Sequence, residues 1–173
     1  MKIPAPTPEE YAPFYARYVE TARNRHCDEV LNADVQPLED VFDRLTESAA
    51  DGAYAPGKWT VKEVLIHCID AERIFAARAL RLLRGDASPL PGYDQDPYVP
   101  ASRSDLRTLA DIRAEWASVR AATVSLFRYS PPENLTFIGT ADGSPVSARA
   151  LAYIIPGHYL HHIEVLNRKY GLG

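Results

Sequence analysis

The stretch WTVKEVLIHCIDAERIFAARALRLLRG, residues 59–85, decides the fold because it defines one long helix with a single histidine. Thr60 and Glu63 have the spacing of a capping box, in which each side chain bonds the other residue's backbone N–H. The glycine that ends the stretch supplies a C-terminal stop. Apolar residues recur at the helical period, and His67 lies on or beside the buried stripe. The stretch therefore predicts a helix over residues 61–84 that carries this histidine toward the core.

Two further long helices are predicted nearer the C-terminus. Thr108 begins one of them, which continues to about Phe127 before two prolines end it. Ser147 begins the other, which stops at Gly171. Pro156 lies inside this last helix and removes one of its backbone hydrogen bonds, so we expect a kink there.

The first quarter of the chain has weaker signals. Thr7, Pro8 and Glu10 have the spacing of a capping box with proline at the first helical position, so a helix is predicted to begin at Pro8. We expect it to be interrupted and to resume over residues 28–48, with Pro37 as a kink or break.

Residues 85–105, GDASPLPGYDQDPYVPASRSD, predict a long crossover. Short loops make the first and second helices antiparallel, and likewise the third and fourth, so the second and third are parallel and need a long connection. At about 3.3 Å per residue this segment easily crosses a helix roughly 36 Å long. We therefore predict an all-α four-helix bundle, with a crossover between helices two and three, in a single domain over residues 1–173.

Two loops give different predictions about contact with a ligand. Tyr93 and Asp94, in the crossover, are candidates to meet substrate, the alternative being a turn in which PGY sets the chain direction. The segment TADGSP, residues 140–145, predicts a turn before the last helix and suggests no chemistry.

The last helix contains GHYLHHIEVL, residues 157–166, with three histidines in little more than one turn. Two of them take places where a core-facing seam would normally have leucine, whereas His161 is rotated toward the flank. That seam consists of Leu151, Ile155, His158, His162 and Leu166. Two buried imidazoles are costly unless their nitrogens are satisfied, and a metal ion satisfies both.

A third ligand is expected from His67, because it lies at the same level of the bundle when the second and fourth helices are antiparallel. The sequence thus predicts a divalent transition-metal site formed by His67, His158 and His162. Core histidines that bond to neighbouring groups are the alternative. His161 could replace one of the ligands if the kink rotates the helix, and His26, in a polar stretch, is predicted to be solvated.

Three residues near these histidines have competing interpretations. Asp70 lies three residues after His67, so it has two interpretations: its carboxylate supports a ligand imidazole or acts as a base on a bound water, or it pairs with Arg73. Cys68 is interpreted as a small buried apolar residue rather than a ligand, because neighbouring helical positions diverge by about 100°. Tyr159 stands where a zinc protease of the H-E-x-x-H type has its glutamate, which argues against peptidase chemistry.

Composition excludes several classes of protein. The chain has 173 residues, a net charge of −4 and two cysteines. Because nucleic-acid binding needs clustered Lys and Arg, we expect no such partner. The N-terminus lacks the apolar core of a secretory signal, and no apolar run approaches the roughly 18 residues of a membrane span. The sequence therefore predicts a soluble cytoplasmic protein without a disulfide framework.

Residues 54–170 resemble the DinB/YfiT-like superfamily. The likeness lies in YAPGKWTVKEVLIHCIDAERIFAARALRLLRGD, PLPGYDQDPYV and GHYLHHIEVLNRKYG, which occur in the family's order. The resemblance implies a bundle of up-down-down-up topology, frequent dimerisation and a divalent metal held by the three histidines named above.

The resemblance also implies an activity. Some members are thiol S-transferases that use a low-molecular-weight thiol as cosubstrate, and others are described as metal-dependent hydrolases. We therefore expect a homodimeric metal-dependent enzyme of the S-transferase type acting on a small molecule, with zinc or nickel as the ion. The alternatives are a metal-dependent hydrolase, a metal- or stress-responsive binding protein, and an interaction module that has kept the fold.

Overall fold

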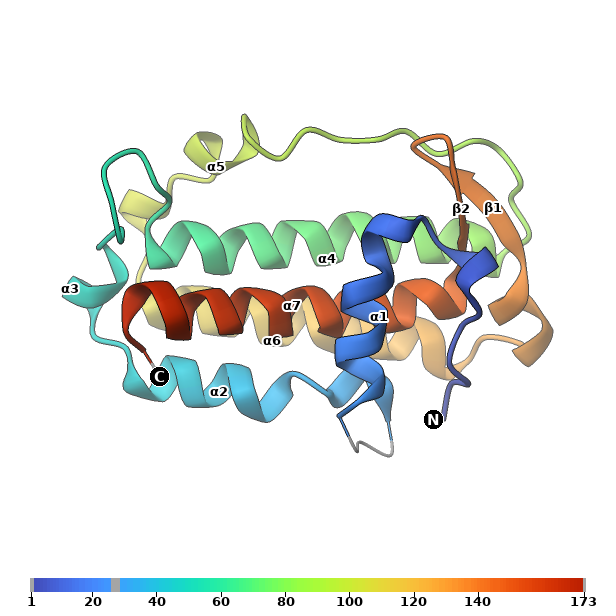
Figure 1. Cartoon of the computed structure of the whole chain (residues 1–173), viewed down its shortest axis with the longest axis horizontal. Helices are drawn as coiled ribbons and strands as arrows, with labels where there is room; N and C mark the ends of the chain where they lie inside the picture. The colour runs from blue at the N-terminus through green and yellow to red at the C-terminus, as the bar shows by residue number, and fades with distance from the viewer. Residues whose placement is uncertain (1, 26–28, 173) are drawn as a thin grey trace.

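Four helices lie side by side in the computed structural model, which describes residues 2–25 and 29–172. They are α2 (Val35–Arg44), α4 (Val61–Leu83), α6 (Leu109–Arg128) and α7 (Ala148–Tyr170). In Figure 1, α4 and α6 run in one direction and α2 and α7 in the other. The mostly helical architecture and the antiparallel packing of α4 against α7 agree with the sequence prediction.

The three long helices begin and end where their caps predict. The Thr60 Oγ1 atom accepts a hydrogen bond from the Glu63 N–H at 3.1 Å, and the Glu63 carboxylate accepts one from the Thr60 N–H at 2.7 Å. Thr108 caps α6 in the same way, and the Ser147 hydroxyl caps α7. Gly85 ends α4 at a φ of 75°, in the left-handed region that favours glycine. Local sequence therefore fixes the lengths of these helices.

The continuous helix predicted from Pro8 is wrong. The segment forms two 3-10 turns, η1 (Pro8–Glu10) and η2 (Pro13–Tyr15), before α1 (Ala16–Arg23) begins. Ala12 is extended, at φ −60° and ψ 141°, because the ring of a following proline disfavours the helical conformation. The α1 helix lies across α7 (Figure 1).

The predicted helix over residues 28–48 is also corrected. The structure has a 3-10 turn, η3 (Val30–Asn32), followed by α2 and a short α3 (Glu47–Ala50). Pro37 neither kinks nor breaks α2, because it lies in the first turn, where its missing N–H would have no partner. The prediction that His26 is solvated concerns a position outside the described residues.

The all-α prediction missed a small β-hairpin in front of α7. Strands β1 (Ile138–Ala141) and β2 (Ser144–Ser147) pair antiparallel. Asp142 and Gly143 connect them, both with positive φ, as a tight hairpin turn requires. The hairpin also holds the crossover, since the Leu90 N–H donates to the Thr140 carbonyl at 2.8 Å and the Leu90 carbonyl accepts from the Asp142 N–H at 3.0 Å.

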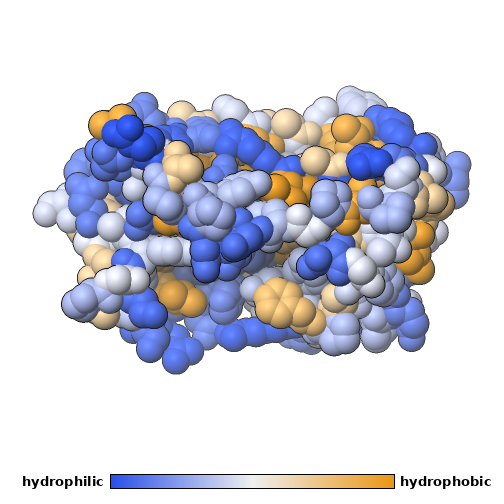
Figure 2. Space-filling view, turned by 90° about the horizontal axis from the view of Figure 1, so that it is seen from above, coloured by the Kyte–Doolittle hydropathy of each residue, from blue (hydrophilic) through white to orange (hydrophobic). Residues whose placement is uncertain are grey.

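The crossover runs back over the bundle from the end of α4 to the start of α6 (Figure 1). It contains a short helix, α5 (Tyr98–Ala101), and a 3-10 turn, η4 (Ser104–Leu106). Figure 2 shows this face of the molecule as mostly hydrophilic, with hydrophobic residues in separate patches. No helix in the described part of the chain is long and apolar enough to cross a membrane.

A buried ionic network joins the helices. Arg120, on α6, donates to the carboxylates of Asp34 at 2.6 Å and Glu72 at 2.9 Å, and all three side chains are buried. The guanidinium also lies 5.2 Å from the ring centre of Tyr159, on α7. A buried charge is tolerated when it is paired and fully hydrogen-bonded, as it is here.

Candidate metal centre

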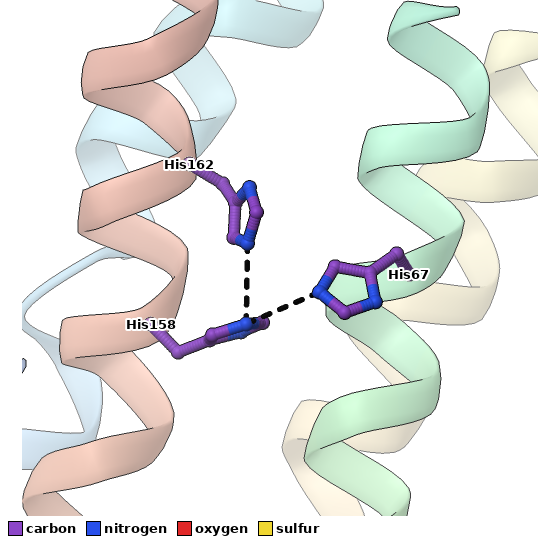
Figure 3. Close-up of side chains that lie close together, drawn as sticks. All are labelled: His67, His158 and His162. Carbon is purple, nitrogen blue, oxygen red and sulfur yellow. Dashed lines mark hydrogen bonds between the residues drawn. The ribbon is translucent and has the colours of Figure 1, made fainter. Parts of the chain in front are cut away.

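Three imidazoles from two helices converge inside the bundle. His67 projects from α4, and His158 and His162 project from successive turns of α7 (Figure 3). The Nε2 atom of His158 lies 3.2 Å from the Nε2 atom of His67 and 3.2 Å from that of His162. The structure thus brings together the three residues that the sequence predicts as ligands.

These distances fit a metal ion. Ligand nitrogens about 2.0–2.1 Å from a tetrahedral ion lie roughly 3.3 Å from one another. One ligand atom from each histidine lies within 4.8 Å of the others. A neutral imidazole nitrogen has a single in-plane lone pair, so the His158 Nε2 atom cannot accept two well-aligned hydrogen bonds at once. The arrangement therefore suits a shared cation better than bonds among the rings alone.

Burial keeps the rings in the form that binds metals. His67 and His158 are only 6% and 7% exposed. Burial lowers the pKa of His67 to about 4, although the Asp96 carboxylate opposes the shift. Burial, and then the neighbouring rings of His67 and His161, lower the pKa of His162 to about 3, and burial lowers the pKa of His158 well below its usual value. All three imidazoles are therefore neutral at pH 7.

All three histidines of the cluster border a cavity of about 530 Å³. Aromatic rings form much of its wall. Trp59 lies 5.0 Å from His67, and Tyr18 and Phe75 lie 5.5 and 6.0 Å from His158, measured between ring centres. A ligand entering the cavity would therefore meet the histidine cluster between aromatic rings, with polar side chains such as Gln95 and Ser144 also in the wall.

His161 also borders the cavity, but it lies outside the three-nitrogen cluster. Its ring centre is 5.4 Å from that of Tyr18 and 5.2 Å from that of His162. Among the described residues, its buried Nδ1 atom has no hydrogen-bond partner. His161 does not replace His158 or His162 as a ligand in this arrangement. The α7 helix continues through Pro156 and presents His158 and His162 together.

Asp70 pairs with Arg73, at 3.3 Å between the carboxylate and guanidinium. It also borders a small pocket beside His67. Burial raises the pKa of Asp70, and the neighbouring Arg73 opposes that shift. The ion-pair alternative is thus present, whereas a supporting role for the carboxylate stays a prediction.

Tyr93, Asp94 and Cys68 lie in three different environments. Tyr93 borders the cavity, and burial raises its pKa to about 12. Asp94 is exposed and accepts a hydrogen bond from the Asp96 N–H, as in a turn. Cys68 is buried, which raises the pKa of its thiol well above the usual value, in agreement with an apolar core residue.

Sequence reasoning missed several residues of the cavity. The hairpin residues Asp142 and Ser144 border it, although their segment was expected to carry no chemistry. Tyr18 and Arg78 also contribute to the wall. Asp142 had a visible signal, since Asp-Gly is typical of a hairpin turn, but nothing local indicated that this turn meets the histidines.

The fold and the cluster together define a helical bundle with a three-histidine candidate metal centre. Residues 31–166 match the model of the DinB superfamily, so the chain belongs to this superfamily, as the resemblance of its motifs implied.

The structure is similar to that of YfiT from Bacillus subtilis, which is described as a probable metal-dependent hydrolase with an unusual four-helix bundle topology. The TM-score is 0.67, with 20% sequence identity over 94% of each chain, which establishes a shared fold. No curated protein matches the chain.

Proposed function

We propose that this protein is a divalent-metal-dependent enzyme of the thiol S-transferase type. The observation that carries the proposal is the convergence of three neutral imidazole nitrogens at the wall of a cavity large enough for a small molecule. A structural metal site is normally closed by four protein ligands, whereas three ligands beside a cavity suit a catalytic site.

His67, His158 and His162 would hold the ion, with zinc or nickel the expected metals. Such an ion lowers the pKa of a thiol or water bound to it, and it polarises a substrate group that coordinates it. The rings of Tyr18, Trp59 and Phe75 would restrict the access of bulk water to the ligand.

S-transfer is our first choice because the ion-holding group itself offers no carboxylate that could act as a base. Among the described residues, the group that could hold an ion contains three histidines and no carboxylate. Hydrolysis normally uses a positioned general base to activate water, whereas a thiol needs only to be deprotonated. We propose a cytoplasmic location, and the cosubstrate would be a low-molecular-weight thiol present there.

A metal-dependent hydrolase is the second candidate. Asp142 supports it, because this exposed carboxylate borders the same cavity and would be available as a base. The fold shared with YfiT, described as a probable metal-dependent hydrolase, also supports this candidate. A protein that only senses or stores a metal is the non-enzymatic alternative.

Other features belong to the proposal as well. The helix directions of Figure 1 support the up-down-down-up order, and we propose this topology together with a homodimer as the assembled form. Tyr93 and Asp94 would contact the substrate from the crossover, and Asp70 would act from the neighbouring pocket on a ligand or on bound water.

Elemental analysis and activity screening test the proposal. Purified protein should contain close to one equivalent of metal, which His67→Gln should abolish and His161→Gln should leave unchanged. The loaded protein should then consume thiol in the presence of an electrophile, with glutathione, bacillithiol and mycothiol as the thiols. Hydrolysis of esters or amides without thiol would instead support the second candidate. A protein that binds metal but shows neither activity would support the non-enzymatic alternative, a metal sensor or store.

A further inference from the structure

Arg78 is a buried cation that borders the cavity. It lies on α4, eleven residues after His67, so the two side chains leave the helix on nearly the same face. Its exposed fraction is 7%. Arg78 and the histidine cluster therefore border the same cavity, and a ligand in the cavity could contact both.

The charge of Arg78 has no carboxylate partner among the described residues. Its Nη2 atom donates to the Pro91 carbonyl at 2.8 Å, and the guanidinium carbon lies 6.0 Å from the ring centres of Phe75 and Tyr93. The comparably buried Arg120 is instead bonded to two carboxylates. Because a buried cation is costly without a counter-charge, Arg78 has the environment of a residue that is completed by an anionic ligand.

The spacing between Arg78 and the histidine cluster is short enough for one small ligand to span. The guanidinium carbon of Arg78 and the ring centre of His158 each lie 6.0 Å from the Phe75 ring centre, so they are at most twice that distance apart. A molecule with a chain of several bonds could therefore reach the histidines at one end and the guanidinium at the other, with its middle against Phe75.

We propose that Arg78 binds the carboxylate of an elongated substrate whose reacting end lies at the three histidines; the reacting end rests on the proposed function. The planar guanidinium matches a carboxylate with two parallel hydrogen bonds. Arg78 is the only Lys or Arg side chain among the described residues that border the cavity. A single positive charge suits a monoanionic carboxylate better than a phosphate dianion.

Binding to the metal-free protein tests Arg78 without any activity assay. Calorimetry would compare hexanoate, hexanol and pentylphosphonate, which share an apolar pentyl chain and differ in the head group. Hexanoate should bind about tenfold more tightly than hexanol, as a charge-assisted hydrogen bond predicts, and at least as tightly as the phosphonate.

Three variants assign the effect to the charge at this position. Arg78→Gln should remove the preference for hexanoate, while its amide can still donate toward the Pro91 carbonyl. Arg78→Lys should keep part of the preference. Arg81→Gln is the matched control, because Arg81 lies on the same helix but pairs with Asp86 at 2.6 Å, and it should leave the preference unchanged. Circular dichroism would verify that each variant is folded.

The outcomes separate this inference from the proposed function. Equal binding of hexanoate and hexanol, or an unchanged preference in folded Arg78→Gln, would overturn the role of Arg78, and tighter binding of the phosphonate would overturn its assignment to a carboxylate. Metal content should be the same in Arg78→Gln as in the unmodified protein. If the unmodified protein binds no metal, the proposed function fails, yet the hexanoate comparison still decides the inference.

Discussion

Gly157 packs directly against the backbone of Tyr18. A Cβ atom at position 157 would lie 2.0 Å from the Tyr18 carbonyl oxygen and 2.5 Å from its carbon. The absence of a side chain thus lets α1 cross α7 closely enough to place the Tyr18 ring 5.5 Å from that of His158. A glycine inside a helix, normally unfavourable by roughly 1 kcal/mol relative to alanine, is required here by packing.

We expect Gly157→Ala to destabilise the protein by about 1–3 kcal/mol despite the higher helix propensity of alanine, because the backbone of α1 must move away. Urea denaturation would measure the loss. Tyr18→Ala is the companion variant, since it removes the ring but leaves the backbone contact, and it should open the cavity wall without the steric clash. A Gly157→Ala protein as stable as the original, or more so, would contradict the close crossing.

The ionic network around Arg120 gives a second prediction. Arg120→Met leaves Asp34 and Glu72 buried without their cation, so we expect a loss of about 3–5 kcal/mol at neutral pH. Arg113→Met is the matched control on the same helix. Its partners, Glu39 and Asp43, are partly or largely exposed, and such pairs contribute at most about 1 kcal/mol.

Urea denaturation of both variants would decide this prediction. Equal losses in Arg120→Met and Arg113→Met would show that the buried network contributes no more than a surface pair. Adding Asp34→Asn and Glu72→Gln to Arg120→Met should recover part of the loss, because the isolated charges are then removed.

The sequence predicted the parts of the site that depend on local signals. Capping residues such as Thr60 and Ser147 define where α4 and α7 begin, and the helical period then determines which histidines face the core. The length of the crossover indicated that the second and fourth helices are antiparallel, which places His67 at the level of His158. These inferences needed only residues near one another in the chain and the lengths of the elements.

The cavity wall could not be predicted in this way. Tyr18 reaches the histidines only because α1 is a separate helix after two 3-10 turns and crosses α7 at Gly157. Asp142 reaches the cavity because a hairpin of two four-residue strands pairs with Leu90 of the crossover. Both placements depend on contacts between distant segments, which helical periodicity does not encode.

The pKa values of the histidines predict how metal binding responds to acid. His67 and His162 have pKa values of about 4 and 3 in the folded protein, against about 6.5 in an unfolded chain. Protons therefore begin to compete with the ion for the folded site only near pH 4, so the protein should retain its metal at pH 5.5 during dialysis against metal-free buffer. Metal loss with a midpoint near pH 6.5 would contradict the effect of burial.

The same shifts predict the stability of the metal-free protein. The unfolded chain binds protons below about pH 6.5, whereas the folded rings of His67 and His162 do not until pH 4 or lower. Stability should therefore fall as the pH decreases from 6.5 toward 4. Bound metal should oppose this, raising the free energy of unfolding by about 2.7 kcal/mol when the free ion is at 100 times its dissociation constant. Thermal unfolding with and without a chelator would measure both effects.

Glu10 gives the last prediction, which concerns the N-terminal segment. Burial would raise the pKa of Glu10, but hydrogen bonds from Arg149, the Thr7 N–H and Ser147 outweigh it and lower the pKa to about 2. The Arg149 Nε atom donates to the carboxylate at 2.6 Å, and the Ser147 hydroxyl donates at 2.7 Å. This carboxylate therefore fastens the start of the chain to the beginning of α7.

A lowered folded pKa means that the stabilisation is complete above the unfolded value of about 4.5 and is lost as the pH falls toward 2. Glu10→Gln should reduce the free energy of unfolding by on the order of 3 kcal/mol at pH 7, and this difference should shrink between pH 4.5 and 2. Glu20→Gln is a control on an exposed residue of α1 and should change stability little at any pH. A difference that stays constant from pH 7 to 2 would show that Glu10 acts through packing rather than through its charge.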